Sequence, residues 1–193
     1  MKAAVYYETG APEVLKYEDV PDPQIFPQGV LVRVEAVSIE GGDTLNRGGG
    51  AMASRPHIVG YQAAGTILEV GSEVGDLKPG QRVVTVNAFG SHAELRVVAA
   101  RTAWPVPDGM DIKIAAAIPV PFGTAHECLF EFGRLKAGET VLVQAGASAV
   151  GIAAIQLAKQ AGATVIATAS SEARLAKLKP LGLDHGIDYA RAD

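Results

Sequence analysis

The chain has 193 residues, of which 48% are hydrophobic and 20% charged, with a net charge of −4. This composition is typical of a soluble globular protein with one large domain or two small ones. No block of Lys and Arg occurs, so nucleic acid is not an expected partner. No apolar run is long enough for a membrane span. The single cysteine, Cys128, excludes an internal disulfide and a multi-cysteine zinc site, and a reducing cytoplasmic setting is expected.

The first part of the chain has the pattern of a β domain. Short segments rich in Val, Ile, Leu and Tyr alternate with stretches rich in Pro and Gly, which is typical of a barrel or a sandwich. The predicted strands are KAAVYYE, VLKYEDV, GVLVRVEAVSI, AAGTILEV, RVVTVN and HAELRVVA. We place this domain at residues 1–122.

Helices are predicted next. DIKIAAAIP indicates a short helix with Asp111 as its N-cap and Pro119 as its end. PFGTAHECLFEFG indicates a second helix that stops at Gly133. These segments mark the change from the β domain to the second domain, which we place at residues 123–193.

The second domain alternates between strands and helices. TVLVQA is an apolar strand that we expect to be covered on both faces, as in a parallel sheet. The helix VGIAAIQLAKQAGA, the strand TVIATA and the helix SEARLAKLKPLG follow, and GIDYA begins a third strand. This β-α-β-α-β order predicts half of a doubly wound Rossmann domain.

The turn AGASAVG, residues 145–151, lies where a Rossmann unit holds a pyrophosphate. The following helix begins with unpaired N–H groups and a partial positive charge, which suit an anion. Gly146 would make the turn, and Gly151 would let the helix approach the strand. The alternative is a plain strand-to-helix turn of small residues. The predicted cofactor-binding residues are Gly146, Ala147, Ser148, Ala149, Val150 and Gly151.

The end of the second strand indicates which dinucleotide binds. NAD enzymes usually carry Asp or Glu there, but TASSEAR has Ser170 and Ser171, followed by Arg174. Hydroxyls and a guanidinium suit a 2′-phosphate, which predicts NADPH. Two alternatives stay open. A serine could be a helix N-cap beside a solvated arginine, and Glu172 could bind the ribose.

Four stretches in this order resemble the zinc-independent quinone oxidoreductases of the medium-chain dehydrogenase/reductase superfamily. They are PQGVLVRVEAVSIEGGDTLNRGG, HIVGYQAAGTILEVGSEVGDLKPGQRV, AAAIPVPFGTAHECLF and LKAGETVLVQAGASAVGIAAIQLAKQAGATVIATASS. The resemblance implies a mixed fold, with a GroES-like β-barrel domain followed by an α/β Rossmann domain. The Rossmann domain is incomplete here, so we expect the chain to be a fragment, a processed product or a part of a longer reductase.

The resemblance also bears on metal binding. Zinc members of the superfamily carry a Cys in the first motif and a His-Glu pair in the second. The matching positions here are Glu40, Tyr61 and Gln62, and Tyr and Gln are poor zinc ligands. We therefore expect no metal in this protein.

The resemblance further implies site residues. Glu40 matches an Asn that lies near the nicotinamide, and Leu45 replaces an aromatic residue. A protonated Glu40 would donate a hydrogen bond or a proton, whereas an ionised one would repel developing negative charge. Thr124 matches a threonine whose neighbours line the cofactor, and Tyr189 matches a tyrosine near the adenosine phosphate. Glu40 and Thr124 are the predicted catalytic residues.

The predicted function is metal-free transfer of a hydride from NADPH to a quinone or an α,β-unsaturated carbonyl. The alternative is a non-catalytic protein of the same fold that binds a nucleotide or a partner. The expected partner is a small-molecule substrate, not a nucleic acid or a membrane. Family members often dimerise, which leaves a homodimer of the full-length form open.

Overall fold

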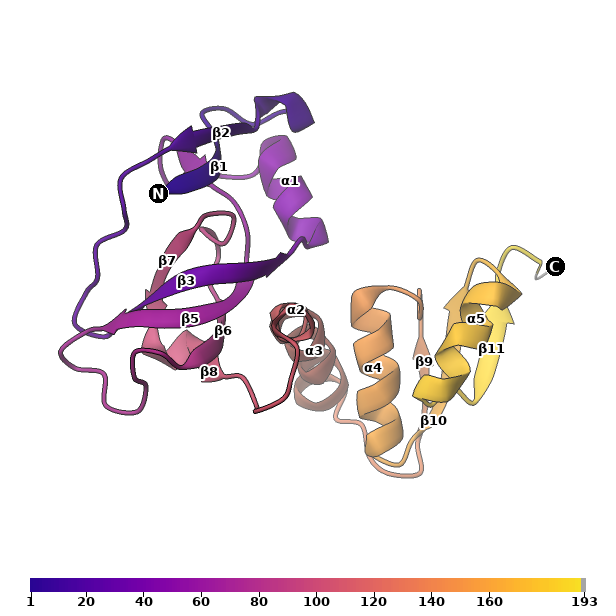
Figure 1. Cartoon of the computed structure of the whole chain (residues 1–193). Helices are drawn as coiled ribbons and strands as arrows, with labels where there is room; N and C mark the ends of the chain where they lie inside the picture. The colour runs from indigo at the N-terminus through magenta and orange to yellow at the C-terminus, as the bar shows by residue number, and fades with distance from the viewer. Residues whose placement is uncertain (192–193) are drawn as a thin grey trace. The chain divides into compact units, whose positions relative to one another are not determined.

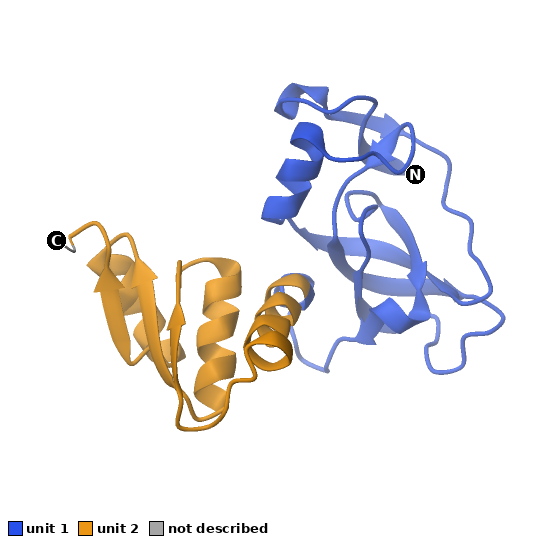
Figure 2. Cartoon of the chain, turned by 180° about the vertical axis from the view of Figure 1, so that it is seen from behind, with its two compact units in different colours: residues 1–119 blue, residues 120–193 orange. Residues whose placement is uncertain are grey.

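The structure, a computed structural model, describes residues 1–191. The chain divides into two compact units, Met1–Pro119 and Val120–Asp193 (Figure 1, Figure 2). The division falls just before the boundary that the sequence predicts between residues 122 and 123.

The first unit contains two antiparallel sheets. The larger one has five strands in the order β7-β3-β5-β6-β8, and the smaller one has three in the order β2-β1-β4. The sequence does not reveal β4 and β8, because strands of two and three residues are too short to show alternation. The strands are β1 (Lys2–Tyr6), β2 (Lys16–Asp19), β3 (Gly29–Ser38), β4 (His57–Ile58), β5 (Gln62–Val70), β6 (Arg82–Val86), β7 (Leu95–Ala99) and β8 (Ala103–Pro105).

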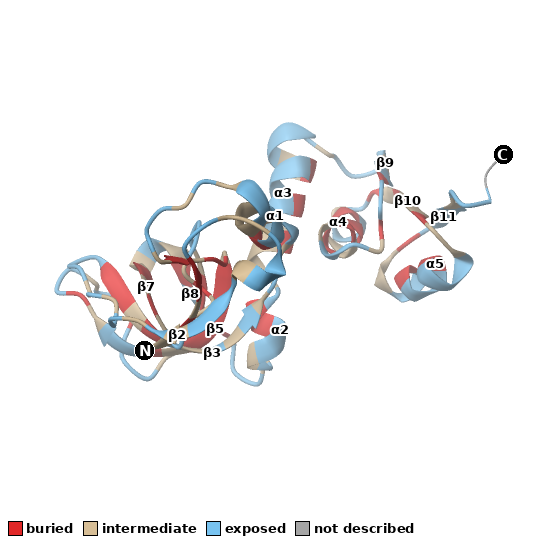
Figure 3. Ribbon diagram, turned by 90° about the horizontal axis from the view of Figure 1, so that it is seen from above, coloured by how far each residue is buried: buried red, intermediate tan, exposed pale blue. Residues whose placement is uncertain are grey.

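Alternating side chains of the larger sheet form the core of this unit. Val30 and Val32 on β3 pack with Ile67 on β5, Val83 on β6 and Val98 on β7, and all five are buried. Figure 3 shows the buried parts of the chain in red. The strand pattern of the sequence therefore corresponds to one inward face, as expected for a β unit with a single core.

One helix of the first unit, α1 (Gly41–Gly49), is not predicted by the sequence. Four of the nine residues in GGDTLNRGG are glycine, which costs about 1 kcal/mol per residue in a helix relative to Ala. Asp43 stabilises its start, because Asp43 Oδ2 accepts a hydrogen bond from the backbone N of Glu40 at 2.9 Å. Asp43 is only 2% exposed, so this cap is part of the interior.

The predicted N-cap at Asp111 is present. Asp111 Oδ1 accepts a hydrogen bond from the backbone N of Lys113 at 2.7 Å, at the start of α2 (Ile112–Ala116). Buried Ala115 and Ala116 attach this helix to the sheet through Ala64 and Val84. The short helix thus closes one side of the β unit.

Pro119 does not end α2, as the sequence suggests, but begins the next helix, α3 (Pro119–His126). Proline is well tolerated at a first helical position, where its missing N–H has no intrahelical partner. A π-helical turn, Glu127–Phe132, continues α3 and ends at the predicted Gly133, whose backbone N donates to the Cys128 O at 2.9 Å.

The second unit has the predicted β-α-β-α-β order. Its three strands are parallel, in the order β11-β10-β9. Pro180 lies in a 3-10 turn, Lys179–Leu181, that follows the last helix. The elements are β9 (Thr140–Val143), α4 (Ala149–Gln160), β10 (Thr164–Ala169), α5 (Glu172–Leu178) and β11 (His185–Asp188).

The core of the second unit lies between these helices and the central strand. Val165 and Ala167 of β10 pack with Ile155 of α4 and Leu175 of α5. The expectation that the first strand is covered on both faces is wrong. Leu142 of β9 is 54% exposed, because β9 is an edge strand and none of the described residues covers that side chain.

The interior histidines of the first unit predict loss of stability in weak acid. Burial lowers the pKa of His57 and of His92 below 6.5, although Asp43 partly opposes this at His92. As the pH falls, these histidines therefore bind protons in the unfolded chain at a higher pH than in the folded one. The stability that is present above about pH 6.5 is lost as the pH falls toward 5. We expect the thermal unfolding midpoint to fall over this range.

A double His57→Gln, His92→Gln variant should show a flatter pH dependence between about pH 7 and 5, a range above the ordinary pKa of carboxylates. The matched control replaces His126 and His185, which are exposed, and should behave as the unchanged protein. If the thermal unfolding midpoint depended on pH equally in all three proteins, His57 and His92 would not be the cause of the loss of stability.

Candidate functional site

The loop that follows β9 is tied to the neighbouring strand. The backbone N of Ala145 donates to Thr168 Oγ1 at 3.1 Å, and the backbone N of Gly146 donates to the Thr168 O at 2.8 Å. Ala145 has a φ of 51°, in the left-handed region that residues with a Cβ rarely adopt. Ala145, rather than Gly146 as expected, therefore makes the turn, and the bonds to Thr168 hold it in this conformation.

The two glycines of the loop permit close packing. A Cβ on Gly146 would lie 2.7 Å from the Cβ of Ala167, and a Cβ on Gly151 would lie 2.5 Å from the backbone O of Ala145. Gly151 therefore lets the first turn of α4 rest on the loop backbone, whereas the sequence suggested contact with the strand. This packing aims the N-terminus of α4 at the carboxyl end of β9.

Two of the predicted serines are helix N-caps. Ser148 Oγ accepts a hydrogen bond from the backbone N of Gly151 at 3.1 Å, and Ser171 Oγ accepts one from the backbone N of Arg174 at 3.4 Å. The cap role that the sequence left open thus falls to Ser171. Each hydroxyl still has its proton, because the oxygen serves only as an acceptor in the cap.

A pocket of about 150 Å³ lies at the carboxyl ends of β9 and β10. Residues from three separate segments line it: Ala145, Ala147, Ser148, Ala169, Ser170, Arg174 and Tyr189. The other predicted cofactor-binding residues do not line the pocket. Of these, Gly146, Ala149, Val150 and Gly151 form the loop and the first turn of α4, and Ser171 caps α5.

The electrostatics of this pocket suit an anion. The N-terminus of α4 carries a partial positive charge, and Arg174 adds a full one. Of the described residues, no Asp or Glu lines the pocket, and Glu172, the alternative ribose ligand, is not in the lining. The arrangement fits a phosphate with an attached sugar, in a space that Ala147 and Ala169 keep open.

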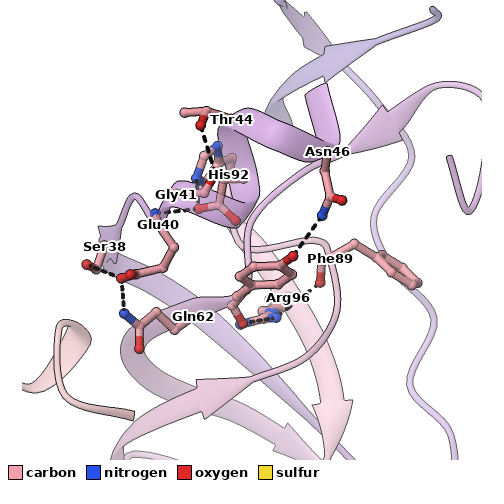
Figure 4. A network of polar contacts seen from close by, with 11 residues as sticks. Ser38, Glu40, Gly41, Thr44, Asn46, Gln62, Phe89, His92 and Arg96 are labelled. Atoms are coloured by element: carbon pink, nitrogen blue, oxygen red, sulfur yellow. Dashed lines mark hydrogen bonds and ion pairs between the residues drawn. The ribbon is translucent and has the colours of Figure 1, made fainter. Parts of the chain in front are cut away.

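In the first unit, Glu40 lies directly before α1 in a network of polar contacts (Figure 4). Its Oε1 accepts hydrogen bonds from Ser38 Oγ at 2.8 Å and from Gln62 Nε2. Glu40 and Gln62, which match zinc-ligand positions of zinc members, are therefore bonded to each other. The Glu40 side chain also forms a capping box with Asp43 at the start of α1.

Tyr61, the third matching position, is held at both ends. Its hydroxyl oxygen accepts a hydrogen bond from Asn46 Nδ2 at 3.0 Å, and its backbone O accepts one from Arg96 Nη2 at 2.8 Å. The ring packs against Gly42, where a Cβ would lie 2.3 Å from Tyr61 Cε2. The sequence did not suggest a functional role for Tyr61.

Arg96 is a buried guanidinium that binds backbone oxygens. It is 3% exposed, and it also donates to the backbone O of Thr85 at 3.3 Å and of Phe89 at 3.1 Å. Burial lowers the pKa of Arg96 to about 10, with Asp43 opposing the change, so the side chain stays charged at neutral pH. A charged residue within the apolar segment HAELRVVA was the only sequence signal of this role.

A second pocket, of about 440 Å³, lies beside this network in the first unit. His57 Nδ1 accepts a hydrogen bond from the backbone N of Ala53 at 3.1 Å, and burial lowers the pKa of His57, so the imidazole is neutral at pH 7. The walls are therefore uncharged. They are formed by Asn46, Ala51, Met52, Ala53, His57, Tyr61, Ala88 and Phe89.

The two predicted catalytic residues lie in different units. Glu40 belongs to the first unit, whereas Thr124 is an exposed residue of α3 in the second and lines neither pocket. Asn46 and His57 were not suggested by the sequence. Asn46 gave no signal because α1 itself was not predicted, and a single histidine carries little information by itself.

Within residues 1–191, no group of three or more His, Cys, Asp or Glu side chains is placed to hold a metal ion. None of the helices in that part of the chain has the length and apolar character needed to cross a bilayer.

Comparisons with known proteins agree with this architecture. Residues 27–108 match the family model of the alcohol dehydrogenase GroES-like domain, and residues 149–193 match that of the zinc-binding dehydrogenases. The chain is 36% identical to a quinone oxidoreductase of Rattus norvegicus, over 89% of this chain and 54% of the relative. It is 37% identical to a chloroplastic NADPH-dependent alkenal/one oxidoreductase of Arabidopsis thaliana, over 99% and 53%.

Solved structures give the same result. The quinone oxidoreductase of Pseudomonas syringae pv. Tomato DC3000 superposes with a TM-score of 0.93 at 34% identity, over 100% of this chain and 60% of that one. The Escherichia coli quinone oxidoreductase complexed with NADPH gives 0.92 at 29% identity, with the same coverage. The chain thus spans about half the length of the curated relatives and 60% of these solved structures.

The fold is therefore a GroES-like domain followed by part of a Rossmann-like domain, as predicted, and the chain belongs to the medium-chain dehydrogenase/reductase superfamily. Within that superfamily it is a quinone oxidoreductase-like protein.

The close approach at Gly151 predicts a large effect of one methyl group. Gly151→Ala would place a Cβ 2.5 Å from a backbone oxygen that cannot move without distorting the loop. We expect the free energy of unfolding of the second unit to fall by about 1–3 kcal/mol. Chemical denaturation measures this change.

Gly123→Ala is the matched control, because Gly123 lies on α3 and a Cβ there meets nothing within 4 Å. This variant should be unchanged or more stable by up to about 1 kcal/mol, since Ala is the better helix former. Equal stability of the two variants would show that the loop does not depend on Gly151.

Proposed function

We propose that this chain binds NADPH and takes part in zinc-independent transfer of a hydride to a quinone or an α,β-unsaturated carbonyl. The observation that carries the proposal is the pocket at the ends of β9 and β10, which joins Ser148, Ser170, Arg174 and Tyr189. Sequence reasoning assigned these four residues, from separate segments, to one dinucleotide.

The residues present fit the adenosine end of this cofactor. The N-terminus of α4 and the Ser148 hydroxyl would hold the pyrophosphate, and Tyr189 would lie against the adenosine. Ser170 and Arg174 would hold the 2′-phosphate, because Arg forms strong charge-assisted bonds to phosphate oxygens. The cofactor, when bound, supplies the hydride, and the chain binds and orients the reacting molecules.

The relatives support the reaction class. They include quinone oxidoreductases and an enzyme named for alkenals and enones with NADPH dependence. A solved structure of similar fold is a complex with NADPH. The catalytic roles of Glu40 and Thr124 stay predictions, and within the first unit Ser38 and Gln62 hold Glu40 through its Oε1.

Independence from zinc rests on the chemistry of three side chains. Gln62 and Tyr61 lack the soft or anionic donor atoms that zinc prefers. Their polar groups, together with Oε1 of Glu40, already make hydrogen bonds within the protein. A cytoplasmic location and a homodimer of the full-length form stay predictions.

The assignment of Arg174 to the 2′-phosphate predicts a selective effect. Arg174→Ala should weaken NADPH binding by about 10- to 100-fold, the loss expected for a charge-assisted hydrogen bond, and leave NADH binding unchanged. Fluorescence titration with each nucleotide measures both affinities.

Lys177→Ala is the control, because Lys177 is an exposed cation of the same helix that does not line the pocket. It should leave NADPH binding within about twofold, as expected for a screened surface charge. Equal loss for NADPH and NADH in Arg174→Ala would contradict the assignment. NADPH binding without its consumption in the presence of a quinone or an enone would favour the non-catalytic alternative.

A further inference from the structure

The hydroxyl of Tyr61 has a proton to offer. A phenol has one proton and can also accept hydrogen bonds, and the Tyr61 oxygen already accepts one from Asn46 Nδ2 at 3.0 Å. Within the described residues, no acceptor is bonded to the Tyr61 proton. Tyr61 and Asn46 both line the 440 Å³ pocket, so a ligand there can receive this proton in a hydrogen bond.

The position of this donor is closely defined. The backbone O of Tyr61 accepts hydrogen bonds from Arg96 Nη2 at 2.8 Å and from the backbone N of Asn87 at 2.9 Å. On the other side, the ring lies against Gly42, where even a methyl group would collide with it. A preorganised donor stabilises developing charge more effectively than a mobile one, because it needs no rearrangement.

The remaining walls indicate what kind of ligand fits. Met52, Phe89 and the alanines are apolar, and no Lys, Arg, Asp or Glu lines the pocket. His57 is neutral at pH 7, and its ring lies tilted against Phe89, with 5.8 Å between ring centroids. Such a space suits an uncharged, flat molecule with one hydrogen-bond acceptor, and its volume lies in the usual range for small-molecule sites.

We propose that this pocket binds the carbonyl end of the substrate and that Tyr61 is the catalytic donor to its oxygen, with Asn46 as the residue that orients the hydroxyl. The proposal rests on the proposed function for the reaction itself. When an enone takes up a hydride from NADPH at its β-carbon, the C=C electron pair moves toward the carbonyl oxygen, which becomes an enolate. Tyr61 stabilises that negative charge through its hydrogen bond, and water supplies the proton that completes the reduction.

The test measures binding of a carbonyl probe and needs neither NADPH nor turnover. Acetophenone has a flat ring and a carbonyl but no bond that reacts with the exposed Cys128. Ethylbenzene has a similar shape without the acceptor. In a chemical-shift titration of the chain, both probes should shift the signals of the pocket residues, and acetophenone should bind more tightly than ethylbenzene.

Tyr61→Phe removes only the hydroxyl. It should weaken the binding of acetophenone by about five- to tenfold, the loss of one neutral hydrogen bond, and leave the binding of ethylbenzene unchanged. Tyr17→Phe makes the same chemical change at a tyrosine that is 69% exposed and should have no effect on either probe. Unchanged acetophenone binding in Tyr61→Phe, or equal losses for both probes, would overturn the proposal.

Asn46→Asp provides an independent second variant. A carboxylate of the same shape would accept a hydrogen bond from the Tyr61 hydroxyl, so this proton would no longer reach the ligand. Binding of acetophenone should again weaken, whereas binding of ethylbenzene should not change. Tighter or unchanged acetophenone binding in this variant would overturn the role of the hydroxyl proton. Failure of the unchanged chain to bind acetophenone would refute the pocket itself, whereas loss of NADPH binding alone would refute only the proposed function.

Discussion

The buried guanidinium of Arg96 is the interaction on which the first unit's site depends. A lone buried charge is costly, and here hydrogen bonds to the backbone oxygens of Tyr61, Thr85 and Phe89 compensate it. These oxygens belong to β6 and to the segments before β5 and β7, so one side chain joins three parts of the chain. The negative charge of Asp43 favours the charged form of Arg96 and, through the cap of α1, links it to Glu40.

The two pockets are built on different physical principles. In the second unit, the backbone forms most of the pocket, because Gly146 and Gly151 allow close packing and the N-terminus of α4 supplies a partial positive charge. In the first unit, side chains are held by other side chains, as Asn46 holds Tyr61. The first kind of site tolerates the alanines and serines of AGASAVG, since small size is what the loop requires. The second kind depends on the identity of each residue.

The order of strands and helices in the second unit could be read from the sequence because a parallel sheet and its helices have distinct periods. The residues after the second strand predicted a nucleotide contact at Ser170 and Arg174, the family resemblance implied one at Tyr189, and all three line one pocket. Sequence reasoning missed α1, since the glycines of GGDTLNRGG hide a helix that tertiary contacts stabilise. It also misjudged Leu142, because exposure of an edge strand depends on what lies beside it.

The sequence by itself determined the class of fold and the small-residue turn between β9 and α4, because both depend on local patterns: alternation, helical periodicity and small residues after an apolar strand. Only the tertiary structure decided the surroundings of Tyr61 and Glu40. Asn46, Gly42 and Arg96 reach Tyr61 from α1 and β7, at distances along the chain that no local pattern encodes. Hydrogen bonds between distant segments form only when the sheets bring those segments together.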